Sequence, residues 1–139
     1  MEQQWSERVV VVIKQSLGLA NTAQIEQAFV VLDAAIAEAI LEHQGESTLH
    51  LCRHAAILAH AKGDRGREIE YTKQALPHAK DGRFAAYNLA DLLLRNGQVD
   101  LAQRYATEAY KLRTASETEA DRDLTAAILK QWPNIAENQ

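Results

Sequence analysis

The chain has 139 residues, which suits one domain, and 47% of them are hydrophobic and 24% charged, as in soluble globular proteins. Its net charge of −4 argues against a general nucleic-acid binder, which needs a basic face to displace counterions. Because Cys52 is the single cysteine, no internal disulfide can form. Apolar stretches are too short, or too interrupted by charges, to cross a bilayer, and we do not expect the first residues to act as a secretory signal. We therefore expect a soluble cytoplasmic protein that binds neither nucleic acid nor membranes.

The pattern of apolar residues and helix breakers predicts seven helices, and no segment alternates as a strand would. The first helix should cover about residues 2–17 and end near Gly18. The second should begin at Asn21 or Thr22, which are good N-cap residues, and end before Gly45. Its apolar residues cover more than one stripe, so we expect it to be central and packed on several sides.

The last helix should open at Ser116, with Glu119 three residues later completing a capping box, and end at Trp132-Pro133. Residues 134–139 then resemble a frayed tail. Four more helices are expected before it, over about residues 48–62, 65–79, 83–96 and 99–113.

Self-similarity appears at a spacing of 34 residues, the distance from Gly63 to Gly97. The matched residues are those that a helical hairpin needs. A glycine after the first helix supplies the positive φ of the turn, small residues let two helices approach closely, and large apolar residues fill the space beside them. The other matched pairs are Tyr71 with Tyr105, Ala75 with Ala109, Ala56 with Ala90, and Leu58 with Leu92.

In this pattern the sequence resembles the tetratricopeptide repeat (TPR), whose units follow W-x2-L-G-x2-Y, a glycine turn, and A-x3-F-x2-A. The resemblance is better in residues 83–114 than in residues 49–80. In the better unit two residues depart from it, because Ala86 replaces the tryptophan and Ala106 the phenylalanine, and in the other unit Glu68 stands where a small residue should pack. The matching residues of the better unit are Leu89, Ala90, Leu93, Gly97, Ala102 and Ala109, and those of the other are Cys52, Ala55, Ala56, Ala59, Gly63 and Ala75.

The resemblance implies an all-α fold, a short α-α superhelix of about seven antiparallel helices in a single domain over residues 1–139. Stacked hairpins bury the apolar faces that one hairpin alone leaves open. The alternative architecture is an irregular helical bundle. Within the single domain we expect a divergent N-terminal hairpin over 1–45, repeats over 49–80 and 83–114, and a C-terminal capping helix over 116–132.

The TPR resemblance also implies a protein-interaction module, not an enzyme, which binds a peptide or helix of a partner in a concave groove. The sequence contains no triad, phosphate loop or dinucleotide motif, so no catalytic residue and no cofactor is predicted. The first helix of each unit should line the groove. By helical spacing, the groove residues are His50, Arg53, His54, Phe84, Tyr87, Asn88, Asp91, Arg95 and Arg122.

Some TPR proteins grip a peptide's C-terminal carboxylate, and Arg53, Asn88 and Arg122 fall on positions of that clamp. The match is partial, because Ile57 and Thr118 replace two of its members. An acidic or C-terminal segment is therefore the expected partner. The register of the last helix is open, since a strict 34-residue period would put Asp123 in the core.

Two other functions compete with peptide binding. The first is self-association, in which the apolar N-terminal hairpin or the chain ends pair with a second copy to form a homodimer. The second is a metal- or redox-linked sensor built from His50, His54 and Cys52, although two histidines one turn apart lack a third ligand. Cys52 falls on a packing position, where a buried structural thiol is expected.

Overall fold

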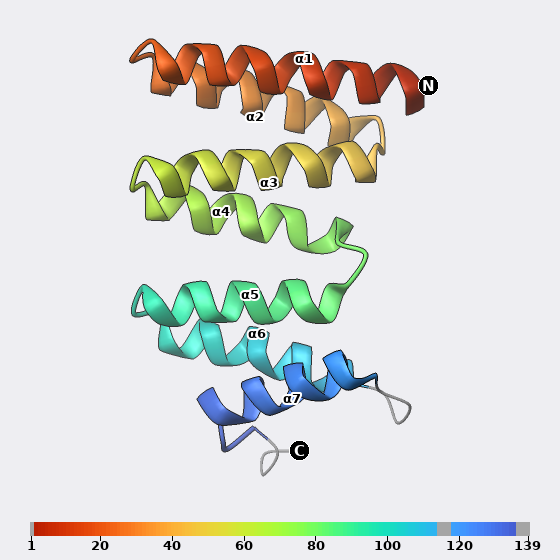
Figure 1. The fold of residues 1–139 in the computed structure, drawn as a ribbon, viewed down its shortest axis with the longest axis vertical. Coiled ribbons are helices and arrows are strands. Elements are labelled where there is room, and N and C mark those ends of the chain that lie inside the picture. The colour runs from red at the N-terminus through yellow and green to blue at the C-terminus, as the bar shows by residue number, and fades with distance from the viewer. Residues whose placement is uncertain (1, 114–117, 136–139) are drawn as a thin grey trace. The chain divides into compact units, whose positions relative to one another are not determined.

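A computed structural model describes residues 2–113 and 118–135 of the chain (Figure 1). Within them the fold is all-α, and helices adjacent in the chain pack as antiparallel pairs. The chain divides into two compact units, Met1–His78 and Ala79–Gln139, here called the N-terminal and C-terminal units. The predicted fold class is confirmed, whereas the single domain over residues 1–139 stays a prediction. The elements are α1 (Glu2–Asn21), α2 (Ile25–Leu41), α3 (Gly45–Ala61), α4 (Arg65–Ala75), the 3-10 turn η1 (Leu76–His78), α5 (Gly82–Arg95), α6 (Val99–Lys111) and α7 (Glu119–Gln131).

The N-terminal unit consists of the α1–α2 and α3–α4 hairpins, and α3 also packs against α1 and α2. The second helix is central as predicted, since α2 lies between α1 and α3 and buries Phe29 and Leu32 completely. Side chains on α4 reach back to α2. Tyr71 stacks on Phe29 with ring centroids 6.0 Å apart and donates a 2.5 Å hydrogen bond to Asp33.

Arg67 of α4 adds a charged link between the two hairpins. Its guanidinium donates to both carboxylate oxygens of Glu26 on α2, at 3.0 and 2.6 Å. It also lies 4.3 Å from the ring centre of Phe29, within the range of a cation–π contact. A bidentate pair of this kind fixes orientation as well as adding energy. The stacking of the second hairpin on the first is thus held by both apolar and ionic contacts.

Four interhelical turns share one geometry, in which a single residue adopts a left-handed backbone. The residues are Ala23, His43, Gly63 and Gly97, with φ of 61°, 57°, 71° and 80°. In each turn the next residue's N–H bonds a carbonyl five residues back, as in the Schellman motif. That next residue is also the N-cap of the following helix, so each turn is as short as the motif allows. The turns predicted at Gly63 and Gly97 are confirmed, whereas the left-handed residues of the other two turns, Ala23 and His43, were not predicted.

Because these turns share a positive φ, replacing glycine by alanine should destabilise the fold, whereas replacing alanine by glycine should stabilise it. Gly97→Ala should lower the free energy of unfolding by about 1–2 kcal/mol, because an L-residue is strained at positive φ. Open space surrounds the position that the new Cβ would occupy, so the backbone alone accounts for the loss. Ala23→Gly should instead raise stability by up to about 1 kcal/mol. Urea unfolding measures both, and shifts of the same sign would contradict the assignment.

The C-terminal unit consists of the α5–α6 hairpin with α7 packed on α6. Of the hairpin residues that matched the TPR pattern, all but the turn residue Gly97 are buried here. Ala86 and Ala106, which replace larger residues of the pattern, are both buried, at 2% and 0% exposed. The fully buried residues of this hairpin are Leu89, Ala90, Leu93, Ala102, Ala106 and Ala109.

Arg83 is the polar member of this core and is only 7% exposed. Its Nε donates to the Ala109 carbonyl on α6 at 3.2 Å, and a terminal nitrogen donates to the Thr125 hydroxyl on α7. A second terminal nitrogen lies 3.9 Å from the Asp121 carboxylate. One side chain of α5 therefore connects all three helices of the unit.

Several predicted helix boundaries are wrong. Helix α1 runs through Gly18 to Asn21, so Asn21 is not an N-cap, and Gln24 occupies that position. The third helix was expected to begin at about residue 48, but α3 begins at Gly45. A Cβ there would lie 3.4 Å from His78 Nδ1, an ordinary van der Waals contact.

The start of α7 and the tail after it also differ from prediction. The N-cap is Thr118, whose hydroxyl and the Asp121 carboxylate form the capping box; the expected N-cap, Ser116, lies outside the described residues. Of the expected tail, Ile135 is 2% exposed and so belongs to the core, while residues 136–139 are outside the described part. The apolar side chain of Ile135 is buried with that of Trp132, which is 7% exposed.

The buried face of α7 resolves the register left open by the sequence. Ile128 is fully buried and Leu124 half-buried, and they lie 35 residues after Leu93 and Leu89. Asp123 is exposed, as a carboxylate should be. The period therefore lengthens by one residue before α7. None of the helices within residues 2–113 and 118–135 combines the length and apolar content of a membrane span.

Candidate interaction surfaces

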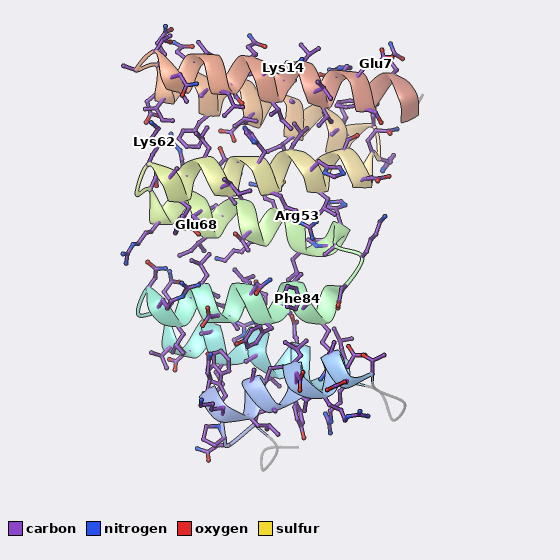
Figure 2. The ribbon with its side chains drawn as sticks, viewed as in Figure 1. Glu7, Lys14, Arg53, Lys62, Glu68 and Phe84 are labelled. Carbon is purple, nitrogen blue, oxygen red and sulfur yellow. The ribbon has the colours of Figure 1, made fainter. Side chains whose placement is uncertain are left out.

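The outer face of α3 carries the predicted groove residues of the N-terminal unit. His50 and Arg53 are exposed, and Figure 2 marks Arg53 on this helix. Ile57, one turn beyond Arg53, is 68% exposed, an unusual position for a large apolar side chain. The face thus combines a cation with an exposed apolar group.

His54 lies at the edge of this face. It is half-buried, and its Nε2 lies 3.2 Å from the hydroxyl of Ser16 on α1. Burial lowers the pKa of His54, since a charged imidazole is poorly solvated there. His54 is consequently a packing residue between α1 and α3 as much as a surface one.

Cys52 is fully buried, and its sulfur lies 4.0 Å from the Gln74 side chain. Burial raises the pKa of this thiol to about 11, with a smaller contribution from Asp33. A thiol in that state is protonated at neutral pH and unreactive, as the packing interpretation predicts. Within the described residues, no three or more His, Cys, Asp or Glu side chains gather closely enough to hold a metal ion.

The corresponding face of α5 belongs to the C-terminal unit. Phe84 is 50% exposed and is marked in Figure 2, and Asn88 is exposed one turn further on. Tyr87 is half-buried, and its hydroxyl accepts a 3.3 Å hydrogen bond from the Gln131 side chain on α7. Asp91 and Arg95, further along this face, form an ion pair in which a guanidinium nitrogen lies 2.8 Å from a carboxylate oxygen. The structure thus brings these five residues together along one helix.

Arg122 is exposed on α7, in the same unit. With the register of α7 shifted by one residue, the position that follows Asn88 in the repeat belongs to Asp123. A carboxylate at that position would repel a peptide's C-terminal carboxylate. The α7 part of the predicted clamp therefore has weaker support than the α3 and α5 faces.

A cavity of about 400 Å³ lies in the N-terminal unit, between the first half of α1 and the start of α3. Val9 and Val10 supply apolar wall, and Ser6 and the α2–α3 turn supply polar wall. Of the residues that line it, sequence reasoning had singled out His50 as a candidate site residue. Sequence reasoning also missed the burial of Arg83. Neither Ser47, in the first turn of α3, nor Arg83, in α5, has a local sequence signal of burial, because tertiary packing alone determines it.

No protein-family model matches this sequence, and no curated protein is similar enough to match. Among solved structures, the chain is similar to the C-terminal TPR-containing domain of a Plasmodium falciparum protein described as FK506-binding. The similarity covers 100% of this chain and 97% of that one, with a TM-score of 0.53 and 13% sequence identity. At this identity the match establishes the fold, and the predicted TPR fold is confirmed.

Proposed function

We propose that this chain is a non-catalytic, cytoplasmic protein-interaction module, in which the exposed face of α3 in the N-terminal unit and that of α5 in the C-terminal unit each bind a peptide or helix of a partner. Domains of the TPR fold generally serve protein interaction, and the two faces lie on first helices of hairpins, where such domains bind. The observation that carries the proposal is the exposure of Ile57 at 68% and Phe84 at 50%, each beside polar or charged neighbours. Exposed apolar groups with a polar rim mark protein-binding surfaces.

The chemistry of the α3 face favours a peptide with an acidic group next to an apolar side chain. Arg53 can pair with a carboxylate in a bidentate manner, and Ile57 can cover an apolar side chain. On α5, Asn88 can hydrogen-bond a peptide backbone, while Phe84 offers a ring for stacking. We accordingly expect an acidic or C-terminal segment as the partner.

Charge reversal at Arg53 tests this preference. A displayed library of random peptides with free C-termini should yield binders enriched in acidic residues. Arg53→Glu should then weaken their binding by about fivefold or more, because attraction becomes repulsion, while the melting temperature stays nearly unchanged. Arg104→Glu makes the same charge change at an exposed position of α6, outside both faces, and is the matched control. Equal losses in the two variants would remove Arg53 from the site.

Self-association is the second candidate, favoured by apolar side chains exposed in the N-terminal unit. Light scattering at micromolar concentration distinguishes the two. A stable dimer that Ile57→Asp and Phe84→Asp both disrupt would assign the faces to a second copy, whereas a monomer supports the peptide-binding proposal. The apolar residues are Val10, Val11, Val30, Ile40 and Leu41, with exposures of 51%, 62%, 61%, 46% and 79%.

A further inference from the structure

Helix α1 has an exposed face on the side opposite its buried residues. Trp5, Val9 and Ala20 are buried in the N-terminal unit, where α1 packs against α2 and α3. On the other side, exposed residues recur at alternating intervals of three and four, the spacing with which two helices pair along their length. The residues of this face are Gln4, Glu7, Val11, Lys14 and Gly18.

Valine side chains form the centre of the exposed α1 face. Val11 is 62% exposed, and Val10 beside it is 51% exposed. A surface hollow of about 370 Å³ adjoins Val11, with Glu7 and Arg8 among the residues that line it. Exposed apolar side chains between polar neighbours mark surfaces that bind protein. The face therefore has the composition of an interface, apolar at the centre and charged on both sides.

The two charged residues of this face form a pattern that complements itself. Figure 2 marks Glu7 and Lys14 on α1, and no ion pair within residues 2–113 and 118–135 includes either of them. They lie equally far along the helix from the midpoint between residues 10 and 11. A two-fold axis at that midpoint places Glu7 of each copy next to Lys14 of the other, in an antiparallel pair. A parallel pair would bring like charges together, so the charges favour the antiparallel orientation.

Gly18 also indicates that another chain approaches this face. Glycine inside a helix destabilises it relative to alanine. Nothing described lies within 4 Å of the position that a Cβ of Gly18 would occupy, so packing within the chain does not require glycine there. In the antiparallel pair, Gly18 lies about level with Gln4 of the other copy. The missing side chain then leaves room for the glutamine.

From these observations we propose that the exposed α1 face binds the same face of a second copy, as an antiparallel dimer with two-fold symmetry. Val11 of each copy packs against Val11 of the other beside the axis, and two ion pairs between Glu7 and Lys14 flank this contact. One helix pair buries a small area, so we expect a weak dimer, with a Kd of roughly 1–100 µM. This inference does not rest on the proposed peptide interaction, because the faces of α3 and α5 take no part in the dimer.

Sedimentation velocity of the full chain, from about 5 to about 500 µM, tests the dimer. The wild type should change from monomer to dimer across this range. Val11→Asp should weaken association at least thirtyfold or so, because it places two carboxylates together at the axis. Val30→Asp is the matched control, since Val30 is 61% exposed on α2, and it should leave association unchanged. A chain that stays monomeric throughout, or equal losses in the two variants, would overturn the proposal.

Charge exchange tests the orientation and register of the two helices. Glu7→Lys and Lys14→Glu should each weaken self-association about tenfold or more, because both ion pairs become repulsive. Mixing the two variants should restore association, since each contact between positions 7 and 14 then joins a lysine to a glutamate. Circular dichroism of each variant alone should match that of the wild type. Variants that associate as tightly as the wild type, or a mixture that stays monomeric, would refute the antiparallel pairing.

Further measurements separate this dimer from the proposed peptide interaction. Ile57→Asp and Phe84→Asp change the α3 and α5 faces and should leave the α1 dimer intact. Val11→Asp should bind the selected peptides as tightly as the wild type does. Failure of peptide binding therefore leaves the dimer to be judged by sedimentation alone. Loss of the dimer in Ile57→Asp or Phe84→Asp, with none in Val11→Asp, would assign self-association to another face and overturn the inference.

Discussion

Leu93→Ala is expected to lower the free energy of unfolding of the C-terminal unit by about 2–5 kcal/mol. Leu93 is fully buried in α5, in a hairpin that also buries Ala86, Ala90, Ala102, Ala106 and Ala109. Alanine side chains cannot change rotamer to fill the space that the leucine would vacate. The cavity should therefore persist, which places the loss in the upper part of the range.

Fluorescence-detected urea unfolding measures this loss. Trp5 lies in the N-terminal unit and Trp132 in the C-terminal unit, so a Trp5→Phe background reports the C-terminal unit through Trp132 alone. Leu112→Ala is the matched control, because Leu112 is 55% exposed and its truncation should change stability by less than about 0.5 kcal/mol. A negligible loss for Leu93→Ala would refute the assigned helix register.

Arg83→Met is expected to lower stability by about 2–3 kcal/mol. Methionine has about the length of the apolar stem of arginine and lacks the guanidinium, so the change tests that group. Its loss removes the hydrogen bonds to the Ala109 carbonyl and the Thr125 hydroxyl, and hydrogen bonds of charged groups contribute about 1.5–3 kcal/mol each. Part of that loss is recovered, because methionine avoids the desolvation of a buried charge.

Arg95→Met provides the comparison on the same helix. Arg95 pairs with Asp91 at 2.8 Å, but its side chain is 67% exposed. Exposed pairs at this spacing contribute about 0.3–0.5 kcal/mol, and added salt screens them. The Arg83 variant should therefore lose several times more stability than the Arg95 variant. Comparable losses in the two would show that Arg83 is not the connection among α5, α6 and α7.

The helices and the hairpin core were predictable because they depend on local information. Helical periodicity and the turn glycines Gly63 and Gly97 locate the hairpins, and the small residues between them locate the close contacts. Gly18 was misinterpreted for a physical reason: a glycine ends a helix only where the backbone turns left-handed, and Gly18 stays helical inside α1. Ala23 and His43 adopt that conformation instead, without the residue type that normally signals it.

The features that the sequence did not reveal depend on partners distant in the chain. Arg83 is buried because a carbonyl of α6 and a hydroxyl of α7 receive its donors. Ser47 is buried because α1 lies beside the start of α3. In both cases the neighbouring sequence is that of an ordinary helix surface. The exposed residues of the α3 and α5 faces were predictable, since helical spacing alone separates outer from inner positions.

The short turns between successive helices also determine how the chain reaches its native state. Each hairpin closes a loop of only a few residues, so little chain entropy opposes the first contacts, and chains rich in such contacts fold quickly. Residues 2–41 contain both partners of the first hairpin. During synthesis this hairpin can pair before α3 has emerged from the ribosome, and it then offers a surface on which the next helices assemble.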